Sequence, residues 1–210
     1  NGTGWSNSQG WNGPPGTECE WYGIICNPAE TAVVNIAFPG NLLIGTIPAL
    51  GNLTKLQGIS FSNNQLTGPL PQLAGLPDLQ WFFASGSHFS GPIPALAGLT
   101  KLEQFDVSDN QLSGSIPPLS GLPKLLFFRV QFNQLTGSVP ALGGLASLQQ
   151  FMIHDNLLTG TLPSLAGLAS LGWFDASFNQ LTGAIPALSG LTNLGYFSVS
   201  VNQLSGAIPP

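Results

Sequence analysis

Charged side chains are scarce in this sequence. Only 6% of the 210 residues are Asp, Glu, Lys or Arg, whereas roughly 25% is usual in a globular domain. Nine acidic residues against four basic ones give a net charge of −5. Because phosphate binding needs a basic stripe and the sequence has none, nucleic acid is excluded as a partner. No apolar run reaches the roughly 18 residues of a membrane-spanning helix, so the sequence predicts no membrane insertion.

Cysteine is also nearly absent, with Cys19 and Cys26 as the two examples. A structural zinc ion needs four ligands, and two cysteines without a nearby histidine or further cysteine supply half of them. The sequence therefore predicts no metal and no cofactor. From residue types alone, Cys19 and Cys26 could be either two free thiols or one disulfide.

The pattern Asn-x-Leu-x-Gly recurs every 23 residues along most of the chain. A fixed period of this length predicts a solenoid, in which each unit buries its apolar face against its neighbours. The third unit replaces Asn with Ser and Leu with Phe. The pattern begins at Asn41, Asn64, Ser87, Asn110, Asn133, Asn156, Asn179 and Asn202.

Within one unit the residue types predict local structure. Residues 104–108 alternate polar and apolar, which is typical of a strand with one wet face, and stacked units would make these strands a parallel sheet. Asn110 is expected to bond backbone groups of successive turns as a ladder. Gly114 marks a turn with positive φ. Pro117 forbids a long helix on the opposite side, so short 3₁₀ turns or irregular segments are expected there.

Phenylalanine occupies an inward strand position in six consecutive units. We expect these rings to stack as a spine in the core. They are Phe82, Phe105, Phe128, Phe151, Phe174 and Phe197.

The unit Leu-x-x-Leu-x-x-Phe-x-Val-x-x-Asn-x-Leu-x-Gly-x-Ile-Pro resembles the plant-type, extracellular leucine-rich repeat over residues 33–210. The resemblance implies eight repeats in an α/β-type solenoid: a curved right-handed superhelix with a parallel sheet on its concave face and short 3₁₀ turns on its convex side. Two departures are a unit one residue shorter than the usual one and Phe in place of the inward Leu. Short units such as residues 93–100 resemble secreted bacterial members, and the source stays open between plant and bacterium.

The run Cys-x-Trp-x-Gly-Ile-x-Cys at residues 19–26 is similar to the N-terminal cap of these repeat proteins. The resemblance implies a cap over residues 1–32 with a Cys19–Cys26 disulfide, helped by three tryptophans in covering the first repeat. A disulfide implies an extracellular or secreted protein, in the periplasm or on the cell surface if the source is bacterial. Residues 1–3 and 52–54 are N-glycosylation sequons that matter only in a eukaryote.

The chain stops at residues 206–210 within a repeat, with no polar C-terminal cap after it. We expect the natural protein to continue with a cap, further repeats or another domain. The alternative is an end covered by a partner or a second copy, which would form an oligomer.

The outward strand positions are not fixed to one residue type by the repeat, so their chemistry gives the best indication of function. Their aromatic members recur about 10 Å apart, because neighbouring strands lie about 4.8 Å apart. Solvated aromatics in one band are typical of an interaction surface. The predicted ligand-binding residues are Trp81, Phe83, Gln104, Asp106, Phe127, Arg129, Gln150, Met152, Trp173, Asp175 and Tyr196.

These residues fit a non-enzymatic recognition module that binds a protein or peptide, as the resemblance to receptor ectodomains and polygalacturonase inhibitors also implies. A cell-wall polysaccharide stacked on the same rings is the alternative. The resemblance adds ice binding, as in some plant members of the family, as a second alternative. It would use a column of hydroxyls beside the repeat glycines, for which the sequence favours a turn-capping role. That column is Thr67, Ser90, Ser113, Thr136, Thr159, Thr182 and Ser205.

Catalysis is not predicted. His154, Asp155 and Ser177 resemble the components of a triad, but a serine recurs at this position along the chain and an oxyanion hole is lacking. Asp106 and Asp175 lie three repeats apart, or about 14 Å, which exceeds the separation of a glycosidase pair.

Overall fold

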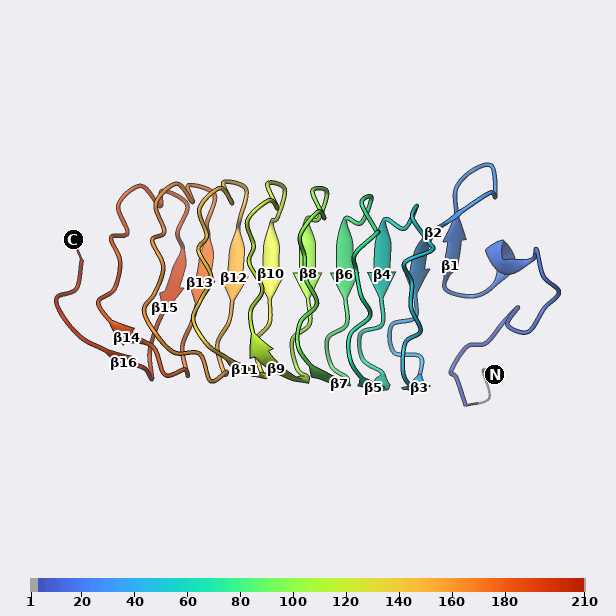
Figure 1. The fold of residues 1–210 in the computed structure, drawn as a ribbon, viewed down its shortest axis with the longest axis horizontal. Helices are drawn as coiled ribbons and strands as arrows, with labels where there is room; N and C mark the ends of the chain where they lie inside the picture. The colour runs from blue at the N-terminus through green and yellow to red at the C-terminus, as the bar shows by residue number, and fades with distance from the viewer. Residues whose placement is uncertain (1–3, 210) are drawn as a thin grey trace.

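The computed structural model describes residues 4–209, which form one solenoid (Figure 1). The first sequon, at residues 1–3, lies outside the described residues. The repeat strands stand side by side along the long axis, from the N-terminal end to the C-terminal end. In this part of the chain no helix is long and apolar enough to cross a membrane.

A nine-stranded sheet forms one face of the solenoid, in the order β1-β2-β4-β6-β8-β10-β12-β13-β15. All neighbours are parallel except β1 and β2, which pair antiparallel. The sheet therefore confirms the parallel arrangement expected from stacked units. The strands are β1 (Ile24–Cys26), β2 (Val33–Ala37), β4 (Gly58–Ser60), β6 (Trp81–Phe83), β8 (Gln104–Asp106), β10 (Phe127–Arg129), β12 (Gln150–Met152), β13 (Trp173–Asp175) and β15 (Tyr196–Ser198).

Further short strands follow the repeat asparagines and were not predicted from the sequence. Five of them form a second parallel sheet in the order β11-β9-β7-β5-β3, and two form a separate pair. They are β3 (Ile44–Gly45), β5 (Gln65–Gly68), β7 (His88–Gly91), β9 (Gln111–Ser115), β11 (Gln134–Thr136), β14 (Thr182–Gly183) and β16 (Gln203–Leu204). The solenoid thus has two hydrogen-bonded ladders.

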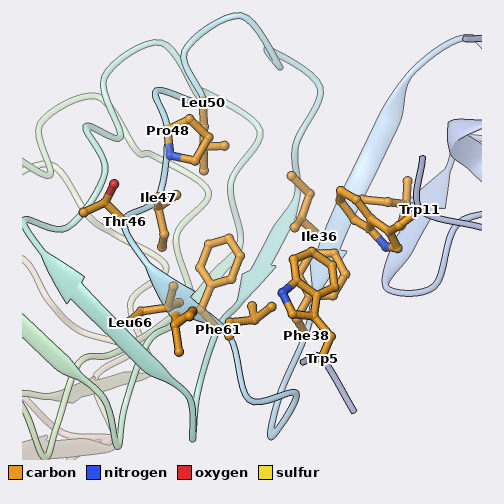
Figure 2. A pocket seen from close by; sticks show the side chains of 13 residues that line it. Trp5, Trp11, Ile36, Phe38, Thr46, Ile47, Pro48, Leu50, Phe61 and Leu66 are labelled. Atoms are coloured by element: carbon orange, nitrogen blue, oxygen red, sulfur yellow. The ribbon is translucent and has the colours of Figure 1, made fainter. Parts of the chain in front are cut away.

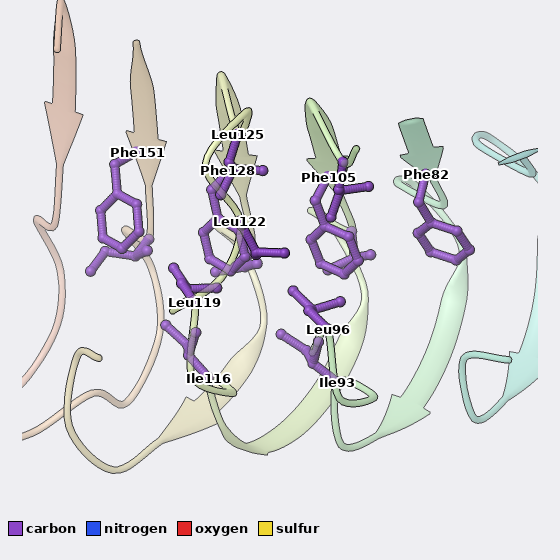
Figure 3. Packing of buried hydrophobic residues seen from close by; sticks show 14 of the residues in the cluster. Phe82, Ile93, Leu96, Phe105, Ile116, Leu119, Leu122, Leu125, Phe128 and Phe151 are labelled. Atoms are coloured by element: carbon purple, nitrogen blue, oxygen red, sulfur yellow. The ribbon is translucent and has the colours of Figure 1, made fainter. Parts of the chain in front are cut away.

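The core confirms the predicted phenylalanine spine (Figure 3). Rings in adjacent repeats stack with centroids 5.2–5.7 Å apart from Phe82 to Phe197. The first two repeats place the large ring two residues later, with Ile36 and Phe38 in one and Ile59 and Phe61 in the next. Phe38 and Phe61 also stack, at 6.3 Å.

The asparagine column forms the predicted ladder. Asn156 accepts a hydrogen bond from the Leu135 N–H through Oδ1 at 2.9 Å. Its Nδ2 donates to the carbonyls of Val130, Ile153 and His154 at 3.0–3.2 Å. One side chain thus satisfies four backbone groups in its own repeat and the preceding one, which a buried turn requires.

The side opposite the nine-stranded sheet is built from single turns rather than helices. The N–H of Leu99 donates to the Leu96 carbonyl, and that of Leu102 donates to the Leu99 carbonyl. Each is an isolated turn closed between residues three apart. Over residues 4–209 the one 3₁₀ helix is η1 (Glu18–Glu20), which lies in the N-terminal cap.

The cap confirms the predicted disulfide between Cys19 and Cys26. Trp11 contacts both Trp5 and Trp21 with ring centroids 4.9 Å apart. Trp5 and Trp11 also pack on Phe38 of the first repeat, at 5.7 and 5.3 Å. The aromatic cluster therefore covers the apolar end that the first repeat would otherwise expose.

Candidate ligand-binding face

The predicted outward column is aligned across the nine-stranded sheet. Each strand pairs with the next so that equivalent residues of successive repeats lie directly beside one another. The aligned positions run Gly58, Trp81, Gln104, Phe127, Gln150, Trp173 and Tyr196. This column and its neighbour two residues later, from Ser60 to Ser198, define the sheet face.

Trp173 and Tyr196 form the most accessible part of the sheet face. Their rings stack with centroids 4.1 Å apart and an interplanar angle of 19°. Trp173 is nevertheless 42% exposed and Tyr196 37% exposed. Stacking therefore fixes the two rings while leaving a large part of their apolar surface exposed.

Trp81 is half-buried because its indole lies over Gly58. A Cβ added to Gly58 would lie only 1.8 Å from the Trp81 ring. The ring also stacks on Phe83, with centroids 5.4 Å apart. The sequence named both aromatics but missed Gly58, whose lack of a side chain makes this packing feasible.

Arg129 is held by three neighbours on the sheet face. Its guanidinium carbon lies 5.1 Å from the Phe127 ring centroid. Its Nη2 and Nε donate to Gln150 Oε1 at 2.5 and 3.1 Å. Its Nη1 also lies 3.6 Å from Asp106 Oδ2, in an ion pair. The N–H groups toward Gln150 are therefore already engaged within the chain.

Each of the two aspartates on this face accepts hydrogen bonds from a serine two residues later. Asp106 accepts hydrogen bonds from the Ser108 hydroxyl at 2.7 Å and the Ser108 N–H at 3.1 Å. Asp175 bonds Ser177 in the same way, at 2.6 and 3.0 Å. Asp175 is buried, so its predicted place on the accessible surface is a correction: its covered carboxylate is satisfied by Ser177, on a strand that lies in register between Met152 and Ser198.

A shallow depression of about 450 Å³ lies beside the exposed rings. Its lining combines one indole with several amide side chains, which can donate and accept hydrogen bonds. The lining residues are Gln149, Gln150, Ser170, Gly172, Trp173 and Asn193. Gln104 and Met152, also predicted as ligand-binding residues, are half-buried elsewhere on the same face.

A second, apolar cavity of about 300 Å³ lies between the cap and the first repeat (Figure 2). Its lining includes Trp5, Trp11, Ile36, Phe38 and Phe61. The cavity coincides with the two repeats in which isoleucine replaces the spine phenylalanine. We assign it to core packing, because its lining residues belong to the interface between cap and repeats.

A leucine rich repeat family model matches residues 101–122. The match covers about one repeat. The strand register and the asparagine ladder show that the same repeat continues along the structure. The chain is a leucine-rich repeat solenoid. No curated protein sequence matches it.

Solved structures of leucine-rich repeat ectodomains are similar to the chain. One is the ectodomain of the receptor kinase GASSHO1/SCHENGEN3 from Arabidopsis thaliana in complex with CASPARIAN STRIP INTEGRITY FACTOR 2. It is 31% identical with a TM-score of 0.85, and the match covers 97% of this chain and 28% of that one. The plant peptide hormone receptor RGFR1 in complex with RGF2 is 33% identical with a TM-score of 0.81, over 84% and 29% of the two chains. The chain thus spans less than a third of either receptor chain.

A plant ice-binding protein is also similar, at 27% identity and a TM-score of 0.54. The match covers 91% of this chain and 80% of that chain. In this leucine-rich repeat solenoid the hydroxyl column lies along the second ladder. Thr67 and Thr182 donate their hydroxyl protons to carbonyls of the preceding repeat, Gly45 and Gly160, at 3.2 and 3.3 Å. These bonds support the turn-capping role that the sequence favoured over ice binding.

The triad components do not assemble. The Ser177 hydroxyl donates to Asp175 rather than to His154. His154 Nδ1 instead lies 2.8 Å from Asp155 Oδ2. The serine–histidine hydrogen bond that a triad requires is therefore absent among the described residues.

The clearest electrostatic perturbation in the repeats lies in the turn before β6. The Lys101 Nζ donates to Asp78 Oδ1 at 2.6 Å. This hydrogen bond, the charge of Lys101 and the weaker charge of Lys55 hold the pKa of Asp78 below its usual value. The perturbation reflects a surface ion pair and points to no catalytic role.

Proposed function

We propose that this solenoid is a non-enzymatic recognition module that binds an extended peptide or protein segment across its sheet face. The observation that carries the proposal is the aligned aromatic column Trp81, Phe127, Trp173 and Tyr196. Large aromatic side chains are enriched among residues that dominate binding energy. The module requires no cofactor.

The receptor structures support the same class of ligand. One similar structure is a peptide hormone receptor with its bound RGF2, and it shares 33% identity with this chain. The disulfide in the cap favours a location outside the cytosol, as in those ectodomains. We therefore propose an extracellular or secreted protein.

A polysaccharide is the second candidate ligand. The depression beside Trp173 offers an indole face together with amides of Gln149, Gln150 and Asn193. A sugar ring would place its C–H face on the indole and its hydroxyls on the amides. Ice binding is a third candidate, favoured by the similar plant ice-binding protein and the exposed hydroxyl column.

Three assays on one preparation separate these ligands. A displayed peptide library tests the main proposal, a glycan array tests the sugar and thermal hysteresis of a dilute solution tests ice binding. The variant Trp81→Ala/Phe127→Ala/Trp173→Ala should lose binding to the enriched peptides. The control Gln65→Ala/Gln111→Ala/Gln134→Ala alters exposed residues of the second ladder and should bind as the wild type does.

Enrichment of peptides whose binding survives the aromatic triple variant would refute the sheet face as the site. Enrichment of glycans without peptides would replace the ligand class while keeping the site. Both variants are checked by circular dichroism, so that unfolding is not mistaken for lost contact.

A further inference from the structure

One residue of each repeat adopts a left-handed backbone conformation directly before the ladder asparagine or its serine substitute. Its φ lies between 51° and 63° in every repeat. Gly, Asn and Asp adopt this conformation readily, whereas bulky and β-branched residues do so only under strain. The residues are Gly40, Asn63, Gly86, Asp109, Phe132, Asp155, Phe178 and Val201.

The last four repeats break this preference at three positions. Phe132, Phe178 and Val201 are strained in the backbone and yet gain little from burial, since they are 48%, 50% and 62% exposed. A role in the core is therefore excluded. Strain that packing does not offset is typical of residues kept for binding.

Carboxylates alternate with the phenyl rings along this line. Asp109, Phe132, Asp155 and Phe178 occupy successive repeats, and we name them the margin strip. The N–H of Phe132 donates to His154 O and that of Asp155 to Ser177 O, at 3.2 and 3.1 Å. These bonds hold successive members about one strand spacing, or ~4.8 Å, apart.

The chain supplies no lysine or arginine to the margin strip. Among the ion pairs within residues 4–209, Lys55 and Lys101 face Asp78, and Arg129 faces Asp106. Asp155 is paired with His154, whose ring also meets the Phe132 ring edge-on at 5.0 Å. The exposed carboxylate of Asp109 forms none of these pairs.

The sheet face contains an internal example of the same chemistry. There the Arg129 guanidinium lies over the Phe127 ring and faces the Asp106 carboxylate. An aromatic ring beside a carboxylate attracts a cation through both the ring quadrupole and the charge. The margin strip repeats this combination twice, with no lysine or arginine paired to it within residues 4–209.

We propose that the margin strip binds lysine or arginine side chains of a cationic peptide segment. Each cationic head would lie against Phe132 or Phe178 and face the Asp109 or Asp155 carboxylate. The net charge of −5 favours such a partner. This proposal rests on the proposed function, because the same peptide would continue from the margin strip onto the sheet face.

A deca-lysine peptide and its fully Nε-acetylated form are the probes, with binding measured by calorimetry. The variant Phe132→Asn/Phe178→Asn leaves the net charge unchanged and installs a residue that favours the left-handed conformation. It should bind deca-lysine about tenfold more weakly, which is the size expected for two cation–π contacts. Its melting temperature should be at or above that of the wild type.

Asp155→Asn tests the carboxylate against a control of equal charge change. Asp78→Asn removes one negative charge from the turn before β6. Asp155→Asn should weaken binding by about tenfold and Asp78→Asn by less than threefold. The acetylated peptide should not bind any of the four proteins.

Equal affinity of the wild type and the double phenylalanine variant for deca-lysine would overturn the proposal. Binding would then come from the net negative charge of the protein rather than from these two rings. A fall in the melting temperature of that variant would overturn the argument from strain. A different result would refute the proposed function, namely that library peptides still bind after the aromatic column has been removed. Library peptides that need Trp173 but carry no lysine or arginine would retain that function and refute the margin strip.

Discussion

The indole of Trp81 occupies the space that a side chain at Gly58 would need. A Cβ at position 58 would lie 1.8 Å from one ring carbon and 2.0 Å from another. The two residues are paired in register on adjacent strands, β4 and β6. Gly58 thus allows the Trp81 indole to pack against the neighbouring strand.

Replacing Gly58 with alanine should therefore displace the Trp81 indole. We expect a large shift of its indole N–H resonance and about a tenfold loss of affinity for library-selected peptides, with a cost in stability of about 1 to 3 kcal/mol from overpacking. The control is Gly143→Ala, because a Cβ there meets nothing within 4 Å. An unmoved indole resonance in Gly58→Ala would contradict the packing described for this pair.

Trp173→Ala should separate binding from stability. The ring is 42% exposed, so its loss should cost about 1 kcal/mol of folding free energy through the stack on Tyr196. Peptide affinity should fall by about 2 kcal/mol or more if the ring anchors the ligand. Tyr196→Phe keeps the ring and its stacking and should bind within about threefold of the wild type. Titration calorimetry measures the affinities, and unchanged binding by Trp173→Ala would remove this residue from the site.

The asparagine ladder yields a pair of opposite predictions. Asn156→Ala removes four hydrogen bonds and leaves buried backbone groups unpaired, at a cost of about 3 kcal/mol. Ser87 occupies the ladder position in the third repeat, where its Oγ accepts from the Asn64 N–H at 3.3 Å. Ser87→Asn should complete the ladder and stabilise the protein by about 1 kcal/mol. Urea denaturation measures both, and a destabilised Ser87→Asn would show that the third repeat cannot accommodate the longer side chain.

The disulfide closes a short loop, since its cysteines are 7 residues apart in sequence. The variant Cys19→Ser/Cys26→Ser should lose about 2.5 kcal/mol by the loop-entropy relation. Hydrogen exchange should rise in β1 and β2 and stay unchanged from β8 onward, because each repeat contacts its neighbours. Uniformly faster exchange along the chain would instead show that the cap controls global unfolding.

The sequence predicted the features that recur with the period. The phenylalanine spine, the asparagine ladder and the strand register all depend on one residue type at one position, so repetition revealed them. The second ladder was missed because its strands, such as Gln111–Ser115, include the repeat glycine, which the sequence marks as a turn. Residue type does not distinguish the buried Asp175 from Asp106, which has the same serine bonds and stays partly exposed. Nothing in the residue type of Phe132 and Phe178 predicts their left-handed backbone.

The ladder and the spine also bear on how long a ligand this protein can accommodate. Side-chain bonds between repeats join residues 21 to 26 positions apart, so each unit is bonded to the unit beside it. Copying one unit, such as residues 110–132, would extend the molecule by about 4.8 Å and preserve every contact on both sides. The distance between Trp81 and Trp173, about 19 Å across four strand spacings, can therefore change only in whole steps. Duplication of one repeat in the gene would therefore lengthen the molecule by one strand spacing, about 4.8 Å.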